Sequence, residues 1–177
     1  MKKVVALFLC LLLFSVCVSA FAEGQTVTLP ESSSSFRAEL TLPDGASFEN
    51  NAAQDGYSLC TVKKDGLADI HIIIAFDELV AGLSLAEMTD EQLDELAALT
   101  SEDGITPAAY QKITAENGQP YLFIETMEGG VLNNYLTVHE SHIVTLTQYR
   151  DEFEPLTEAD CELMLLTLAG LRFLPET

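Results

Sequence analysis

Apolar and polar positions follow three patterns along this chain, and each pattern predicts a different structure. An uncharged, mostly apolar run occupies residues 4–18. Beyond residue 36, short segments alternate apolar and polar side chains, the period of two that is typical of a strand. Two segments instead repeat apolar residues every three or four positions, which favours helices. We therefore expect a leader segment followed by a domain of mixed strands and helices.

Turn residues divide the alternating segments into separate expected strands. The run Ile70-His71-Ile72-Ile73-Ile74 is apolar apart from its histidine, which predicts a central strand covered on both faces. Asn117-Gly118 is the preferred pair for a two-residue type I′ hairpin turn, with both residues at positive φ. Residues 50–56 are small and polar, so we expect a loop there. The expected strands are residues 25–29, 36–42, 57–64, 67–76, 110–116, 119–127, 132–140 and 142–150.

Two helices are predicted by the residues at their starts. The segment Thr89-Asp90-Glu91-Gln92 has the form of a capping box, and Asp103-Gly104 suits the end of that helix. Thr157 and Asp160 form a similar start for a last helix, which Gly170 ends. This last helix is so apolar that it must lie against a sheet. Its two apolar stripes consist of Ala159, Cys161, Leu163, Met164, Leu165, Leu166 and Leu168.

The order of these elements is strands, helix, antiparallel meander and helix, which indicates an α+β fold. We expect an antiparallel sheet of about six to seven strands flanked by two main helices. Residues 36–174 form a single domain in this interpretation. Residues 23–35 contain four consecutive serines and are expected to be a flexible N-terminal segment.

The first 22 residues have the three parts of a secretory signal peptide. Lys2-Lys3 supplies a positive start, the apolar run follows, and Ala20-Phe21-Ala22 fits the small-x-small cleavage pattern. We therefore expect Glu23 to become the N-terminus of a secreted or extracytoplasmic protein, such as a component of a bacterial envelope.

Two alternatives to a cleaved leader remain open. The apolar run is close to membrane-spanning length, so it is long enough for an uncleaved anchor. Cys10 and Cys17 lie within the run and raise the alternative of a lipid-modified protein. Leu9 and Val16, the residues before these cysteines, are larger than those that lipid attachment usually needs.

Charge limits the partners of this protein. The chain has 8 basic and 28 acidic residues, a net charge of −20 that becomes −22 when the leader is removed. Such a surface repels phosphate backbones and anionic lipid head groups. We expect a monomer that binds an unknown protein or small ligand, with no nucleic-acid partner and no anionic membrane surface.

Cys60 and Cys161 are the two cysteines that remain after cleavage of the leader. A pair in an exported protein predicts a disulfide. Two buried thiols that act as small apolar residues are the alternative. The sequence leaves both open.

Four local features, taken in order, resemble a known family: Leu42-Pro43-Asp44-Gly45 after a strand, the strand 69–76, Gly118-Gln119-Pro120-Tyr121 in the meander, and the ending Leu168-Ala169-Gly170-Leu171-Arg172-Phe173. This order resembles the PsbP-like group, exported domains that include the photosystem II PsbP protein and bacterial proteins of the DcrB and LpqN type. The resemblance covers about residues 36–174. It implies an antiparallel sheet between helices and a mostly non-enzymatic binding or accessory role, and it supplies no functional residues.

Histidines provide the candidates for a site. If Glu140-Ser141 is a two-residue turn, His139 and His142 face each other on one side of a hairpin and could share a metal ion, although a zinc site needs a third ligand. A polar hairpin tip with two surface histidines is the simpler interpretation. His71 is expected to be a buried core histidine bonded to a neighbour.

No catalytic motif is present. The acids Asp90, Glu91, Asp94 and Glu95 lack the spacing of a calcium loop and are expected to form a solvated helix face. No Gly-x-Ser-x-Gly elbow or phosphate loop occurs. We therefore expect a non-catalytic binding or accessory domain without a cofactor. The alternative is a small secreted hydrolase that acts through carboxylates.

Overall fold

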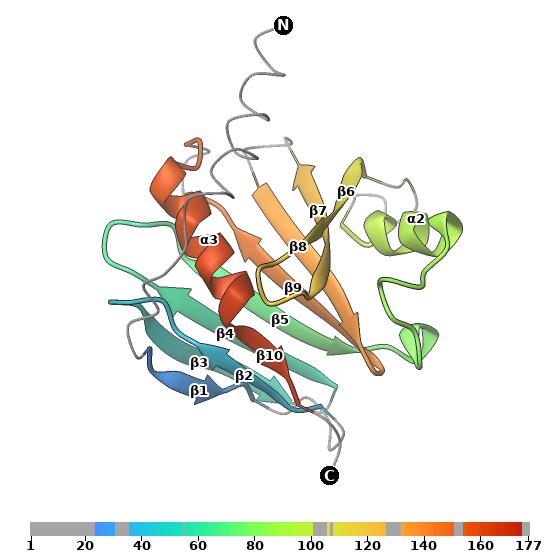
Figure 1. Cartoon of the computed structure of the whole chain (residues 1–177), viewed down its shortest axis with the longest axis horizontal. Helices are drawn as coiled ribbons and strands as arrows, with labels where there is room; N and C mark the ends of the chain where they lie inside the picture. The colour runs from blue at the N-terminus through green and yellow to red at the C-terminus, as the bar shows by residue number, and fades with distance from the viewer. Residues whose placement is uncertain are drawn as a thin grey trace, which may run out of the picture.

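The computed structural model has an α+β architecture within the residues that it describes, 24–30, 36–54, 56–100, 106, 108–126, 132–150 and 154–174. Within these residues, a seven-stranded antiparallel sheet, a three-stranded antiparallel sheet and two α-helices make up the fold (Figure 1). The expected fold class is therefore confirmed. The expected signal peptide and the serine run lie outside the described residues. No described helix is long and apolar enough to cross a membrane.

The large sheet has the strand order β3-β4-β5-β9-β8-β7-β6, and every neighbouring pair is antiparallel. Its last four strands are the expected meander. The strands are β3 (Ser47–Gln54), β4 (Tyr57–Lys63), β5 (Ile70–Phe76), β6 (Tyr110–Thr114), β7 (Pro120–Thr126), β8 (Leu132–His139) and β9 (His142–Gln148).

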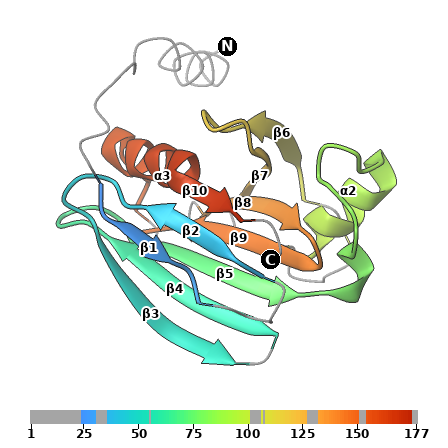
Figure 2. The ribbon, with the colours of Figure 1, turned by 60° about the horizontal axis from the view of Figure 1, so that its bottom comes forward.

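The small sheet joins the two ends of the domain. Strand β2 (Ala38–Thr41) pairs with β1 (Thr26–Thr28) on one side and with β10 (Leu171–Phe173) on the other. Helix α3 (Glu158–Gly170) runs directly into β10, as Figure 2 shows. A Cβ atom on Gly170 would collide with the carbonyl oxygen of Thr41, so the close approach of α3 to β2 requires glycine there.

Both predicted helix starts are confirmed. Thr89 caps α2 (Asp90–Ala98) in a capping box with Gln92, and Thr157 caps α3 in a capping box with Asp160. Helix α2 ends at Ala98, and the expected stop at residues 103–104 lies outside the described residues. A short 3₁₀ helix, η1 (Glu78–Val80), precedes α2.

Two hydrophobic clusters lie on opposite faces of the large sheet. The first is between this sheet, the small sheet and α3, and includes Ile72 of β5 and Leu168 of α3. The second lies between α2 and strands β7 to β9, and includes Leu96 and Leu136. Alternate residues of β7, β8 and β9 supply the two clusters, as the period of a strand requires.

Helix α3 lies against the sheets, as expected, but it does not bury all of its leucines. Leu163, Met164 and Leu168 lie in the core, whereas Leu165 and Leu166 are 37% and 39% exposed. A helix that packs on one layer buries only one side of its surface.

Residues 50–56 also differ from what the sequence predicts. The expected loop is largely strand, because β3 extends through Gln54 and pairs with β4. The register shifts between Asn50 and Ala52, which marks a bulge. Since β3 is an edge strand of the large sheet with exposed side chains at residues 50–53, it lacks the apolar alternation by which the sequence identifies strands.

The turn at Asn117-Gly118 also differs from the expected type. Gly118 has a φ of +85°, but Asn117 is not at positive φ. Gly118 N donates to the Ala115 carbonyl at 2.9 Å, and Ala115 N donates to the Gln119 carbonyl at 2.9 Å. These bonds define a three-residue loop, a tight turn followed by a glycine bulge. The type I′ prediction is wrong because the asparagine side chain has a tertiary role, described below.

Candidate functional site: the open face of the large sheet

One face of the large sheet is only partly covered. Helix α2 packs over strands β7 to β9, but over β4 and β5 several side chains of the same face stay half-buried, including Leu59, Ile73 and Ala75. We call this partly covered surface the open face. The expectation that β5 is covered on both faces is therefore wrong. Its even-numbered residues Ile70, Ile72 and Ile74 are fully buried, and its odd-numbered residues from His71 to Ala75 are not.

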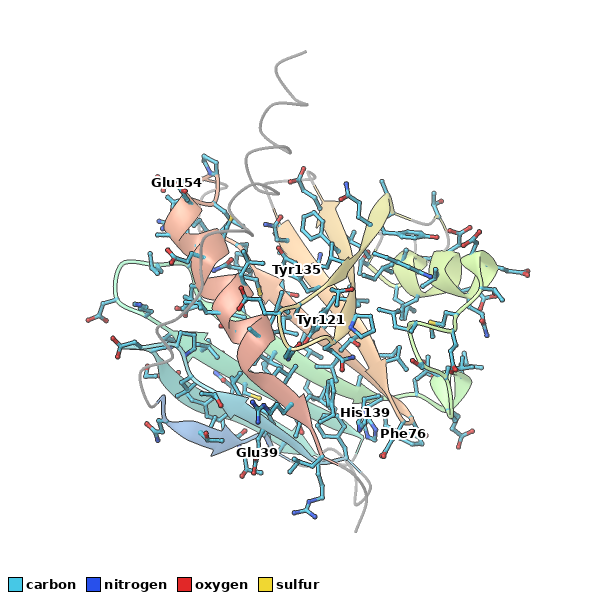
Figure 3. The ribbon with its side chains drawn as sticks, viewed as in Figure 1. Glu39, Phe76, Tyr121, Tyr135, His139 and Glu154 are labelled. Carbon is cyan, nitrogen blue, oxygen red and sulfur yellow. The ribbon has the colours of Figure 1, made fainter. Side chains whose placement is uncertain are left out.

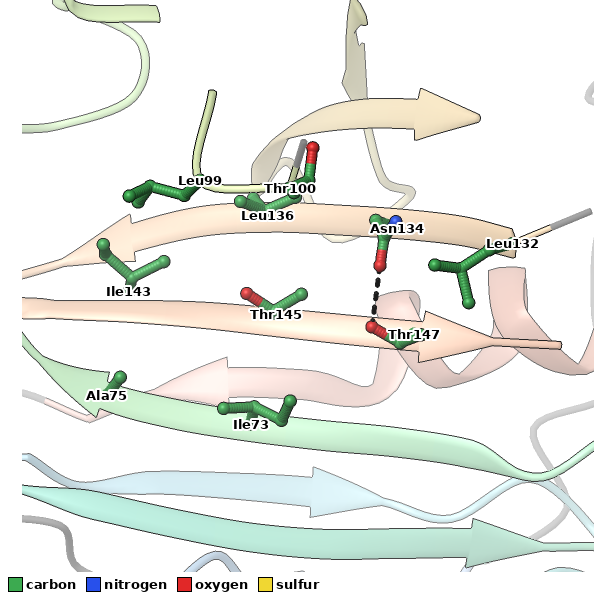
Figure 4. Close-up of a pocket in the computed structure, with 10 residues that line it drawn as sticks. All are labelled: Ile73, Ala75, Leu99, Thr100, Leu132, Asn134, Leu136, Ile143, Thr145 and Thr147. Carbon is green, nitrogen blue, oxygen red and sulfur yellow. Dashed lines mark hydrogen bonds between the residues drawn. The ribbon is translucent and has the colours of Figure 1, made fainter. Parts of the chain in front are cut away.

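A groove of about 400 Å³ lies on the open face beside the C-terminal end of α2. Figure 4 shows its lining side chains standing on β5, β9 and β8, with Leu99 and Thr100 alongside. All of these side chains are apolar, hydroxyl or amide groups. The lining consists of Ile73, Ala75, Leu99, Thr100, Leu132, Asn134, Leu136, Ile143, Thr145 and Thr147.

The groove borders a row of polar side chains that crosses five neighbouring strands, β3, β4, β5, β9 and β8. Register pairs place Thr61 opposite His71, His71 opposite Thr147, and Thr147 opposite Asn134. Thr147 Oγ1 donates to Asn134 Oδ1 at 2.8 Å, and Thr61 Oγ1 donates to Asn51 Oδ1 at 3.0 Å. We call these five residues the polar row. Strand pairing places Thr61, His71, Thr147 and Asn134, and a side-chain hydrogen bond joins Asn51, at the bulge of β3, to Thr61.

His71 belongs to this row and not to the core. Its Nδ1 lies 3.3 Å from Thr61 Oγ1, and its ring stacks on Tyr149 with centroids 5.5 Å apart. The expectation of a bonded neighbour is confirmed, but the expectation of burial is wrong because His71 is half-buried on the open face. A strand residue with apolar neighbours on both sides still points to the opposite face from them.

His139 and His142 lie at the end of the β8–β9 hairpin. Glu140 and Ser141 form the two-residue turn, Glu140 has a φ of +54°, and the histidines are register partners as expected. Figure 3 labels His139 near Phe76 at this end of the sheet.

Aromatic rings surround both histidines. His139 stacks on Phe173 of β10 with centroids 4.4 Å apart, and His142 contacts Phe36 at 4.8 Å. Burial lowers the pKa of both imidazoles, and His139 lowers that of His142 further. The expected surface hairpin tip is wrong for His142, which is fully buried. The cluster joins the hairpin to the small sheet, and the metal site stays a prediction.

The cysteines have different surroundings. Cys60 is fully buried in the first cluster, and burial raises the pKa of its thiol to about 12. Cys161 is half-buried on α3. The structure holds both as thiols, and the disulfide stays a prediction.

The acids of α2 lie where the sequence placed them. Asp90, Glu91, Asp94 and Glu95 are exposed, and Asp94 accepts a hydrogen bond from the Tyr110 hydroxyl at 2.9 Å. Among the described residues no group of three or more histidine, cysteine or acidic side chains has the arrangement of a metal site.

The groove and the polar row were missed by sequence reasoning. A usable signal exists in Thr145 and Thr147, which alternate with Val144 and Leu146 along β9. This alternation shows that one face of β9 is less apolar than the other. It does not show which residues of β5 and β8 lie beside that face.

Comparisons with known proteins give a likeness to solved structures. No protein-family model matches the chain, and no curated protein matches it. The solution structure of cyanobacterial PsbP (CyanoP) from Synechocystis sp. PCC 6803 is similar, with 12% identity, a TM-score of 0.48, and coverage of 89% of this chain and 99% of that one. The function of this chain is therefore argued from its own residues.

Proposed function

We propose that this protein is an exported, non-catalytic binding domain whose ligand lies in the groove on the open face. The observation that carries the proposal is the lining itself. Apolar side chains such as Ile73 and Ile143 form its floor, and Thr145, Thr147 and Asn134 add a few hydrogen-bonding groups. This combination, in a space of about 400 Å³, is typical of a site for a small molecule or a short segment of a protein.

The chemistry of the lining supports binding over catalysis. Acid–base or nucleophilic catalysis requires a titratable or nucleophilic group at the reacting atom. No titratable side chain is among the described residues that line the groove, its hydroxyl groups belong to threonines, and Thr147 is already bonded to Asn134. A ligand would be held by contact area and hydrogen bonds.

Export is the second part of the proposal. The Lys2-Lys3 start, the apolar run and the Ala20-Phe21-Ala22 site support cleavage before Glu23. The intact mass of the protein recovered from the medium or periplasm of an expressing bacterium tests this part. A mass that begins at Glu23 is expected, and retention of the uncleaved chain in the membrane would overturn it.

A neutral fluorescent probe tests the groove. Nile red carries no charge, so the acidic surface neither attracts nor repels it. We expect saturable binding that the variant Ala75→Trp abolishes, because the new ring fills the groove. Leu79→Trp is the matched control, since Leu79 is 86% exposed on η1 and does not line the groove. Equal binding by both variants would overturn the proposal.

A further inference from the structure

The polar row allows the tautomer of His71 to be assigned. Thr61 has one hydroxyl proton, which it donates to Asn51 Oδ1 at 3.0 Å. The 3.3 Å contact between Thr61 Oγ1 and His71 Nδ1 therefore needs Nδ1–H as the donor. In neutral His71 this leaves Nε2, at the tip of the ring, with a lone pair that accepts a hydrogen bond.

An aromatic face lies beside this acceptor. Tyr149 is 44% exposed and its ring stacks on His71 at an interplanar angle of 27°. Aromatic faces attract cations, and Tyr is among the rings that do so well. His71 and Tyr149 together offer one hydrogen-bond acceptor and one cation-binding face at the border of the groove.

The charges near the row have the sign that suits a cation. Lys63 lies two residues from Thr61 on the same face of β4, and its ammonium is paired with Glu49 at 2.8 Å. Asp69, two residues before His71, also interacts electrostatically with Lys63. The two carboxylates exceed the one ammonium. The chain as a whole has the same sign, with a net charge of −20.

The groove lies directly against the row. Thr147 belongs to both, because it lines the groove and is the register partner of His71. Cross-strand partners lie about 5 Å apart. Ile73, which also lines the groove, follows His71 by two residues on the same face of β5. One ligand can therefore contact apolar side chains along its body and the polar row at its end.

We propose that the ligand is a small amphiphile with a primary ammonium head. Its alkyl part lies along the groove over Ile73 and Ile143, and its head donates a hydrogen bond to His71 Nε2 over the ring of Tyr149. This inference rests on the proposed function, since it names the ligand class of the same groove. It adds a head-group site that the groove lining by itself does not contain.

Three probes with the same chain length test the head group, each used below its micelle-forming concentration. Decylammonium is a cation with N–H donors, decyltrimethylammonium is a cation without donors, and decanoate is an anion. We expect calorimetric titration of the purified protein to rank decylammonium first, decyltrimethylammonium about tenfold weaker, and decanoate without measurable binding.

Three variants test which side chains bind the head group. His71→Phe keeps a flat ring beside Tyr149 but removes the acceptor, so the preference for decylammonium over decyltrimethylammonium should disappear. Tyr149→Leu should weaken both cations and leave Nile red binding unchanged. Thr61→Val tests the positioning role of Thr61. We expect nitrogen NMR of His71 to show Nε2 unprotonated in the unaltered protein and mixed tautomers in Thr61→Val.

The outcomes separate this inference from the proposed function. Equal affinity for the two cations, or binding of decanoate, would overturn the head-group site while Nile red binding still supports the groove. Failure of Nile red and of every decyl probe would overturn both. Decylammonium binding that survives Ala75→Trp would place the cation elsewhere on the acidic surface and would also overturn the inference.

Discussion

Arg150 and Asp160 form a bidentate ion pair that ties the end of β9 to the first turn of α3. Arg150 Nε donates to Asp160 Oδ2 at 2.7 Å, and its Nη2 donates to Oδ1 at 2.9 Å. Asp160 is fully buried and also accepts from Ala68 N at 2.7 Å and from Thr157 N at 2.6 Å. One carboxylate thus joins β9, α3 and the segment before β5.

Asp160→Asn should strongly destabilise the fold. The amide keeps the shape of the side chain but loses the charge that Arg150 faces, and it places a donor where acceptors are needed. We expect the free energy of unfolding in urea to fall by about 3 kcal/mol. Glu162→Gln, an exposed position of α3, is the control and should change it by less than about 0.5 kcal/mol. A similar small loss for Asp160→Asn would contradict this account.

The same carboxylate predicts acid sensitivity in a defined window. Burial by itself raises the pKa of Asp160, but the hydrogen bonds from Arg150, Ala68 and Thr157 outweigh it and hold the pKa well below its usual range. The unfolded chain therefore binds the proton first as pH falls. Stability from Asp160 is complete above about pH 4 and is lost below it. Urea midpoints between pH 5 and pH 2 measure this loss, which Asp160→Asn should not show.

His139 and His142 predict a second loss of stability at milder pH. Burial lowers the pKa of both, so the folded state holds them neutral where the unfolded chain is protonated. Their contribution is complete above about pH 6.5 and decreases as pH falls below it. Thermal unfolding between pH 8 and pH 5 checks this. The double variant His139→Phe, His142→Phe should flatten the curve, and an unchanged curve would contradict the prediction.

Asn117 fastens the β6–β7 turn to the end of α3. Its Nδ2 donates to the carbonyls of Leu171 at 2.7 Å and Leu168 at 3.1 Å. Asn117→Ala should cost about 1–2 kcal/mol in unfolding free energy, because helix-end carbonyls lose their donor. Glu116→Ala, the exposed neighbour in the same turn, should be nearly neutral. An equal loss of unfolding free energy in the two variants would mean that the loss comes from the turn and not from the hydrogen bonds of Asn117 to Leu168 and Leu171.

The two thiols should differ in reactivity. The buried Cys60 thiol has its pKa raised to about 12, so very little thiolate forms at pH 8. We expect iodoacetamide to label half-buried Cys161 first in the native protein and Cys60 only after unfolding, as peptide mapping would show. The disulfide is tested in the same samples. If both cysteines of the exported protein resist labelling even after unfolding, and become labelled only when a reductant is added, the disulfide is present.

Short-range signals account for the parts of the fold that sequence reasoning placed correctly. Thr89 and Thr157 cap helices through residues three positions away, so both starts could be predicted without knowledge of the fold. The two-residue turn at Glu140-Ser141 was only one option from the sequence, and the strand register shows that it forms. Where a partner is distant, prediction failed. The type of the turn at Asn117 was predicted wrongly because the acceptors of its side-chain hydrogen bonds lie more than fifty residues later in the chain.

The candidate site could not be predicted for a related reason. Ile73, Thr147 and Asn134 come from three strands, and only the register of β5, β9 and β8 brings them to one surface. His71 has the same local neighbours whether its face is covered or open. Helix α2 covers β7 to β9 and stops short of β4 and β5. This position of the helix leaves the face that carries His71 open.

The sequence by itself determined the α+β class, the antiparallel meander, the two helices and the acidic character of the chain, because period, caps and charge are properties of neighbouring residues. The tertiary structure alone decided that β3 is an edge strand, that β1, β2 and β10 form a second sheet, and that one face of the large sheet stays open. Each of these depends on which distant segments pair, and pairing is settled by the burial that the whole chain achieves together.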